Sequence, residues 1–253
     1  MTSGDLRRSS PAPGVLQLDL ARPDVHNAIS LGLQRELDAA LADAADDSDV
    51  RVVVLAGDGP AAFSAGYDLK ELRAMTADAR ATSMLERDEL LWRYFTFPKP
   101  TVAAVHGMAY GAGTLLAVCS DLRVGGPGTS ITVTAAKYGG ANLTWVLDHL
   151  IGAGQARDLL MTSRTVAGEE ASRMGLVSRY AADGDVLGSA LEAAGQIAAQ
   201  PPESLREIKA LLLEGPGRDL RSRYDRENVV SRTTLRPRPV EEMFTSYFGS
   251  RAR

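Results

Sequence analysis

Two short stretches of the chain combine glycine with other small residues in a way that brings main-chain N–H groups close to an anionic atom. The first is FSAGYDLKEL, residues 63–72, and the second is HGMAYGAGTLLA, residues 106–117. In both, a strand-like segment runs through small residues into a helix-like segment. The first N–H groups of a helix have no partner within it and lie at the positive end of its dipole. Each stretch can therefore donate hydrogen bonds to an oxygen that carries developing negative charge.

Either stretch alone has a plainer explanation, because glycine also allows a helix to pack closely against its neighbour. The sequence offers little support for other kinds of functional site. The three histidines lack the spacing of metal ligands, and no GxGxxG fingerprint of a dinucleotide site occurs. The single cysteine, Cys119, lies in an apolar run, where burial is expected rather than reactivity.

The segments around these stretches predict an α/β chain. Strands are expected in VLQLDLA from Val15, VRVVVLAG from Val50, PTVAAVHG from Pro100 and LRVGG from Leu122. A helix that begins after Ser30 is expected between the first two strands, because leucines repeat every four residues along one face. After about Asn142 the pattern changes to successive helices.

Three regions are expected along the chain. Residues 1–13 are interpreted as a flexible N-terminal tail, residues 14–195 as the α/β core and residues 196–253 as a helical region. In the last region, the apolar residues of ESLREIKALLLEG (203–215) and of VEEMFTSYFGS (240–250) are assigned to core or subunit interface rather than to ligand contact.

Charge and composition narrow the classes of partner. The 253 residues carry 28 Lys plus Arg against 32 Asp plus Glu, a net charge of −4, which gives no reason to expect a nucleic-acid or anionic-membrane partner. No apolar run is long enough to span a bilayer, and the N-terminal arginine pair is not followed by the hydrophobic segment of an export signal. With a single cysteine as well, a cytoplasmic protein is expected.

Four stretches occur in an order and at a spacing that resemble the crotonase, or enoyl-CoA hydratase/isomerase, superfamily. They are RPDVHNAIS (22–30), FSAGYDLKEL (63–72), KPTVAAVHGMAYGAGTLLAVCSDLRV (99–124) and AGEEASRMGLVSR (167–179). The resemblance covers residues 15–251. It implies a spiral of ββα turns, a C-terminal helical trimerisation region and a homotrimer or dimer of trimers. It also implies a CoA thioester as ligand, with coenzyme A entering as part of the substrate and no permanently bound cofactor.

The resemblance also assigns site residues. The two oxyanion-hole amides of the family fall on Tyr67 and Ala112, and one such donor typically contributes about 3 kcal/mol to transition-state stabilisation. The phenol of Tyr67 is bulkier than the residue that relatives usually carry there, and it either packs against a helix above the site or contacts the substrate. The CoA site is matched by Val25, His26, Ala28, Ala65, Asp68, Leu69 and Lys70.

The chain departs from the family at the catalytic acids. The position of the first carboxylate is Leu115, the partner glutamate aligns near Thr132, and a third acidic position aligns near Gly140. No Asp or Glu lies between Asp121 and Asp148. General acid–base catalysis needs a titratable group within hydrogen-bond reach, so hydration by two glutamates is not expected.

Three mechanisms remain open. In the first, a malonyl-type thioester loses carbon dioxide without a protein base, and Thr132, Asn142 or Tyr138 orients the leaving carboxylate. In the second, a hydratase or isomerase uses an unconventional proton carrier, such as Tyr67 or a water held by Thr114 and Asn142. In the third, the chain binds acyl-CoA without turnover, as a carrier or scaffold. A structural or interaction role is the alternative outside CoA chemistry, and the polar candidates also suit ordinary strand, cap and packing positions.

Overall fold

The computed structural model describes residues 4–235. The chain divides into two units, Met1–Gln200 and Pro201–Arg253. The boundary therefore falls five residues later than the predicted 195/196, because helix α8 (Val186–Ala198) packs along the sheet of the first unit and buries Ala190, Ala194 and Ala198 there.

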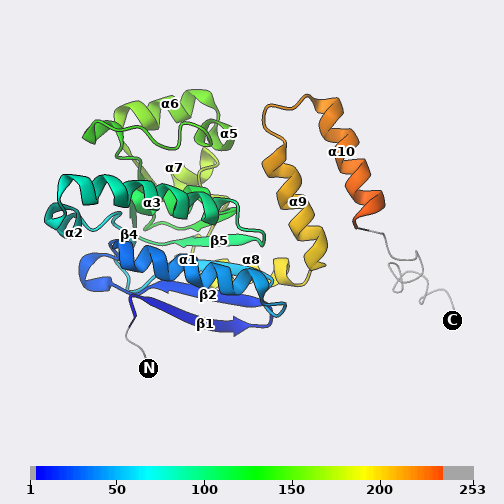
Figure 1. Cartoon of the computed structure of the whole chain (residues 1–253), viewed down its shortest axis with the longest axis horizontal. Coiled ribbons are helices and arrows are strands. Elements are labelled where there is room, and N and C mark those ends of the chain that lie inside the picture. Colours follow the sequence, from blue (N-terminus) through cyan, green and yellow to red (C-terminus); the bar gives the residue numbers. More distant parts are fainter. Residues whose placement is uncertain (1–3, 236–253) are drawn as a thin grey trace. The chain divides into compact units, whose positions relative to one another are not determined.

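The first unit contains two sheets (Figure 1). The six-stranded sheet has the order β1 (Leu6–Ala12), β2 (Val15–Leu20), β3 (Val52–Gly57), β5 (Thr101–Val105), β7 (Leu122–Gly125) and β10 (Arg179–Tyr180). The four-stranded sheet has the order β4 (Ala62–Ser64), β6 (Met108–Tyr110), β8 (Ser130–Thr132) and β9 (Thr165–Ala167). β1 and β9 pair antiparallel to their neighbours and the other pairs are parallel.

Helices connect these strands. In the first unit the α-helices are α1 (Leu31–Asp46), α2 (Leu69–Ala74), α3 (Ala77–Phe95), α4 (Ala112–Cys119), α5 (Leu147–Ile151), α6 (Ala153–Thr162), α7 (Gly168–Arg173) and α8, and η1 (Pro23–Val25) and η2 (Ala136–Tyr138) are 3-10 turns. The described part of the second unit contains α9 (Pro202–Glu214) and α10 (Leu220–Thr233).

The chain alternates between the two sheets as it advances. It passes from β3 to β4, from β5 to β6 and from β7 to β8, so each step adds one strand to each sheet, and α2, α3 and α4 return it to the six-stranded sheet. Parallel neighbours end at the same edge of their sheet. The loops after β4 and β6 are therefore brought together although they are far apart in the sequence.

The core has two parts, one on each face of the six-stranded sheet. On one face the continuous β-branched run of β3 contributes Val52 and Val54, which pack with the alanines of α8. On the other face Leu55 and its neighbours pack with α1, α3, α4 and the second sheet, and Cys119 is buried there as predicted. The α/β prediction and the four predicted strands are confirmed, as is Ser30 as the cap of α1, since its hydroxyl accepts the N–H of Leu33 at 3.0 Å.

The prediction of a flexible tail over residues 1–13 is wrong for Leu6–Ala12, which form β1. β1 runs antiparallel to β2 at the edge of the sheet, and nearly all its side chains are exposed. No hydrophobic alternation marks it, because main-chain pairing holds it in place. Arg7 adds an ion pair with Asp58 at 2.8 Å.

The described part of the second unit, residues 201–235, consists of the helices α9 and α10. On α9, Ile208 and Leu212 are 53% and 64% exposed, which leaves part of the predicted apolar stripe open to solvent in the single chain. The apolar stretch predicted at residues 240–250 lies outside the described residues. Within residues 4–235, no helix has the length and hydropathy needed to cross a membrane.

Candidate active site

The two glycine-containing turns meet at one edge of the four-stranded sheet. β4 and β6 are parallel neighbours, and the turns that follow them leave the sheet side by side. Gly66 has a φ of +97°, and a Cβ atom placed on it would lie 2.7 Å from the carbonyl oxygen of Tyr110 and 3.1 Å from the nitrogen of Ala112. Only glycine lets the two main chains come this close.

The main-chain N–H of Tyr67 points away from the contact that holds its turn. Ile29 donates its N–H to the carbonyl of Gly66 at 2.7 Å and accepts the N–H of Asp68 on its own carbonyl at 3.0 Å. This parallel bridge uses the groups on either side of Tyr67 and leaves the N–H of Tyr67 on the opposite side. Within residues 4–235 that N–H has no hydrogen-bond partner.

The N–H of Ala112 is available for a different reason, since Ala112 is the first residue of α4. The first hydrogen bond along this helix runs from the N–H of Leu115 to the carbonyl of Gly111, at 3.1 Å. Ala112 comes three residues before Leu115, so its N–H has no acceptor within the helix, and it is unpaired among the described residues. It also lies at the positive end of the α4 dipole, which favours a negatively charged partner.

The glycines of the second turn also serve close packing. A Cβ atom on Gly113 would overlap the carbonyl oxygen of Ser64, so this position requires glycine for α4 to lie against β4. Thr114 adds to this packing, because its buried hydroxyl contacts the carbonyls of Ala109 at 2.6 Å and Thr132 at 2.8 Å. Thr114 is also 0% exposed, so the structure gives no support to a water held by its hydroxyl.

The residues assigned to CoA lie on two adjoining segments. The N–H of Ala65 donates to the carbonyl of His26 at 2.9 Å. Arg22 joins both segments, because its guanidinium donates to the carbonyl of Ala28 at 2.6 Å and to the carboxylate of Asp68 at 3.0 Å. The structure therefore brings the early turn and the first glycine turn together.

The side chains on these segments differ in exposure. His26, Leu69 and Lys70 are exposed, Val25, Ala65 and Asp68 are half-buried, and Ala28 is buried. Asp68 caps α2 by accepting the N–H groups of Lys70 at 3.0 Å and Glu71 at 3.2 Å. Burial opposes ionisation of Asp68, but these hydrogen bonds and the Arg22 ion pair outweigh it and lower the pKa of the carboxyl. The Asp68 side chain thus organises the turn.

The ring of Tyr67 packs against Arg87 of α3. The guanidinium carbon lies 4.4 Å from the ring centroid, which is cation–π distance. Burial raises the pKa of the phenol to about 12, and the nearby Arg87 charge only partly offsets this effect. The phenol stays protonated at neutral pH, which does not favour Tyr67 as a proton carrier.

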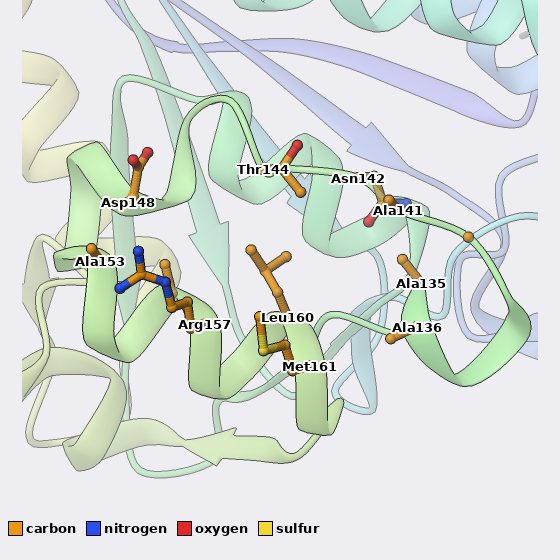
Figure 2. Close-up of a pocket in the computed structure, with 12 residues that line it drawn as sticks. Ala135, Ala136, Ala141, Asn142, Thr144, Asp148, Ala153, Arg157, Leu160 and Met161 are labelled. Carbon is orange, nitrogen blue, oxygen red and sulfur yellow. The ribbon is translucent and has the colours of Figure 1, made fainter.

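A cavity of about 440 Å³ lies between the 135–144 segment and helices α5 and α6 (Figure 2). Its lining residues are mostly small or apolar: Ala135, Ala136, Gly140, Ala141, Asn142, Thr144, Asp148, Ala153, Ala156, Arg157, Leu160 and Met161. The cavity wall begins next to the second turn. The hydroxyl of Thr134 would lie 3.3 Å from a Cβ atom on Gly111, and the next residue along the chain, Ala135, lines the cavity.

The structure separates the three polar candidates. Asn142 lines the cavity, and its buried Oδ1 has no hydrogen-bond partner within residues 4–235. The hydroxyl of Thr132 lies 2.8 Å from that of Thr165, so a neighbouring side chain already engages it. Tyr138 is 76% exposed and does not line the cavity. Of the three, only Asn142 lines the cavity.

The structure places two of the three positions that the family resemblance assigns to acids. Leu115 is 7% exposed and belongs to the hydrophobic core, and Gly140 lines the cavity. The cavity does include one acid and one base that no pattern in the sequence singled out. These are Asp148 and Arg157, which lie at one end of the group of lining residues in Figure 2. The sequence analysis touched on Asp148 only as the end of the stretch without Asp or Glu that begins after Asp121, and it did not touch on Arg157. Among the described residues, no cluster of three or more His, Cys, Asp or Glu could hold a metal ion.

The two sheets, the alternating path of the chain and the paired glycine turns define a protein of the crotonase fold. The family model described as enoyl-CoA hydratase/isomerase matches residues 11–251. The chain belongs to the enoyl-CoA hydratase/isomerase family.

Curated relatives support this placement. A protein of Thermus thermophilus named putative enoyl-CoA hydratase is 36% identical over 234 residues, which span 90% of this chain and 92% of the relative. The short-chain-enoyl-CoA hydratase of Clostridium acetobutylicum is 30% identical over 209 residues, 79% of this chain and 78% of that protein.

Solved structures support the fold. The crystal structure of enoyl-CoA hydratase from Bacillus anthracis matches with a TM-score of 0.91 at 28% identity and covers 98% of this chain and 97% of that one. A putative enoyl-CoA hydratase from Streptomyces coelicolor matches with a TM-score of 0.88 at 28% identity, covering 98% and 92% of the two chains.

Proposed function

We propose that the chain binds an acyl-CoA thioester and stabilises the enolate of its acyl group with the main-chain N–H groups of Tyr67 and Ala112. One observation carries the proposal. Both N–H groups lack partners among the described residues, and they belong to turns that Gly66 allows into contact. Donors that are fixed before the substrate arrives need no reorganisation when charge develops. Family membership and the names of the relatives support a thioester as the ligand.

The CoA portion is assigned to the adjoining segments around His26 and Ala65. Main-chain groups of these segments supply the shape of the site, and the exposed ammonium of Lys70 can meet a phosphate. The family resemblance also supports a homotrimer or dimer of trimers, and the single cysteine supports a cytoplasmic location.

The proposed reaction of the enoyl-CoA hydratase or isomerase type runs without the usual glutamates. Leu115 cannot carry a proton, and the Thr132 hydroxyl is engaged by Thr165. The enolate that the two amides stabilise must therefore exchange protons with solvent or with a group at the cavity wall. Asp148 is the acid that lines this cavity.

A second candidate is decarboxylation of a malonyl-type thioester, which the buried amide of Asn142 favours. The two ends of an amide can be exchanged by rotation, so Asn142 can present its NH₂ group to a carboxylate, and Arg157 lines the same cavity. When the carbon–carbon bond to the carboxylate breaks, its electron pair moves into the thioester to form an enolate and carbon dioxide is released. The enolate then takes a proton from water, so this reaction needs no protein base.

The test is to incubate the purified protein separately with crotonyl-CoA and with methylmalonyl-CoA, and to measure the binding of each by calorimetry. Hydration of crotonyl-CoA supports a glutamate-free hydratase, and release of carbon dioxide from methylmalonyl-CoA supports the decarboxylase. Tight binding without product supports an acyl-CoA carrier. If neither thioester binds, the proposal is wrong and a structural or interaction role remains.

A further inference from the structure

We propose that Arg87 is a positioning residue, which holds the ring of Tyr67 and thereby orients the main-chain N–H of the same residue toward the thioester oxygen. This inference rests on the proposed function, since it adds a second contact, besides the bridge to Ile29, that fixes the proposed oxyanion donor. In this chain the donor residue carries a large side chain, so a contact that fixes the side chain also restrains the main chain that donates.

Arg87 lies at the junction of three helices. It is fully buried, and its guanidinium donates to the carboxylate of Glu71 on α2 at 2.6 Å and to the amide oxygen of Gln34 on α1 at 3.2 Å. The side chain of Gln34 donates back to the carbonyl of Arg87 at 3.0 Å. Glu71 in turn accepts the N–H of Leu31 at the start of α1 on both of its oxygens, at 3.1 Å each. The guanidinium is therefore held in one orientation.

Arg87 reaches the first glycine turn by two routes. Its guanidinium donates to the carbonyl of Ile29 at 3.3 Å, and Ile29 is the residue that bridges Tyr67. It also lies 4.4 Å from the centroid of the Tyr67 ring. The first contact holds Ile29, which pairs with the turn, and the second holds the side chain of Tyr67, whose main-chain N–H is the proposed donor.

The energetics of Arg87 suit a positioning role. A fully buried guanidinium is costly to desolvate, and its Nε has no hydrogen-bond partner among the described residues. A buried ion pair such as Arg87–Glu71 is weak support for stability, because replacing both partners by apolar side chains is often neutral, whereas removing one partner leaves the other charge uncompensated and is destabilising. A planar, fixed cation can however stack on an aromatic ring, which neither lysine nor methionine can do in the same way.

The experiment measures the polarisation of a bound thioester carbonyl. Crotonyl-CoA labelled with a heavy isotope at the thioester carbonyl carbon is bound to the protein, and the carbonyl stretch is read by difference infrared spectroscopy. Hydrogen bonds to the oxygen lower its frequency. The variants are Arg87→Met and Arg87→Lys, with Arg93→Met as the matched control. Arg93 is also on α3, but it pairs with Asp38 at 2.8 Å on the surface.

We expect the wild-type protein and Arg93→Met to lower the carbonyl frequency equally. Arg87→Met is expected to lose more than about half of that shift while the dissociation constant for crotonyl-CoA rises less than about tenfold, and Arg87→Lys is expected to fall between them. If Arg87→Met does not fold, the Arg87→Lys result decides.

Three results would overturn the inference in distinguishable ways. A full shift in Arg87→Met, or in Arg87→Lys where only that variant folds, would show that Arg87 does not orient the donor and would leave the proposed function intact. An equal loss in Arg93→Met would show that α3 acts as a whole. Binding without any shift in the wild-type protein would remove the proposed oxyanion hole itself, and the role of Arg87 with it.

Discussion

The nitrogen of Ala112 lies against Gly66, so closely that a Cβ atom on that glycine would sit 3.1 Å from it. This contact joins two turns that belong to different strands of the four-stranded sheet. It places the N–H of Tyr67, one residue beyond Gly66, next to the N-terminus of α4. The proposed function depends on this arrangement, and each of the following predictions tests one part of it.

Replacement of Gly66 by alanine should disrupt the site. The φ of +97° is strained for any other residue, and the added methyl would meet the carbonyl oxygen of Tyr110 at 2.7 Å. We expect the free energy of unfolding to fall by about 1–3 kcal/mol and acyl-CoA binding to weaken. Denaturant titration and calorimetry measure the two effects. Gly184→Ala is the control, because Gly184 has a φ of +87° but no atom within 4 Å of the place that a Cβ would occupy. Equal behaviour of the two variants would argue against a special contact at Gly66.

Replacement of Ala112 by proline should remove one donor with little effect on folding. Ala112 is the first residue of α4, a position that tolerates proline, since its N–H has no partner inside the helix. If the protein turns over a thioester, we expect kcat to fall about 10²- to 10³-fold while thermal stability changes little. Ala112→Gly retains the N–H and is the matched comparison. A proline variant as active as the glycine variant would show that this N–H does not take part.

Replacement of Tyr67 by phenylalanine should change the rate by less than about twofold, because the phenol is a poor base and the main-chain N–H remains. Burial raises the pKa of this phenol to about 12 from its ordinary value of 10.0. A raised pKa in the folded state contributes stability that is complete below pH 10 and is lost as the pH rises toward 12. The difference in unfolding free energy between wild type and Tyr67→Phe should therefore change only in that alkaline range. A large loss of rate at neutral pH would instead make the phenol catalytic.

The thiol of Cys119 should be inert in the folded protein. The side chain is 2% exposed, and burial raises its pKa to about 12. We expect labelling by a disulfide reagent at about pH 8 to be at least about 10²-fold slower than in denaturant, because the thiolate is the reacting species. The raised pKa also means that this group contributes stability at neutral pH, which is lost as the pH rises from about 9 toward 12. Rapid native-state labelling would contradict the burial of α4 in the core.

Replacement of Asn142 by leucine separates stability from function. The amide Oδ1 is buried without a partner in the described residues, and an unsatisfied buried polar atom costs about 1–3 kcal/mol. The leucine variant should therefore be at least as stable as the wild type. If the decarboxylase candidate is correct, it should also lose carbon dioxide release from methylmalonyl-CoA. Lower stability together with unchanged turnover would show that the amide has an unseen structural partner and no ligand.

The sequence predicted the features that local chemistry determines. Continuous β-branched residues marked β3, the leucine repeat marked α1, Ser30 marked its cap, and glycines marked both turns. Each of these signals lies within a few residues of the structure that it predicts.

Features that depend on distant partners could not be predicted in this way. β1 is an exposed edge strand without a hydrophobic pattern, and β4, β6, β8 and β9 have three residues each, too few to show a period. The cation–π contact of Arg87 with Tyr67 and the position of Arg157 at the cavity depend on how helices α3 and α6 pack against the rest of the first unit. Spacing along the chain carries no information about such contacts.

The most direct measurement is a crystal structure of the protein with butyryl-CoA, a thioester that cannot be hydrated. We predict that the thioester oxygen lies about 2.7–3.1 Å from the main-chain nitrogens of both Tyr67 and Ala112. A bound thioester whose oxygen contacts neither nitrogen, or an N–H of either residue turned to a neighbouring carbonyl, would contradict the proposed oxyanion hole.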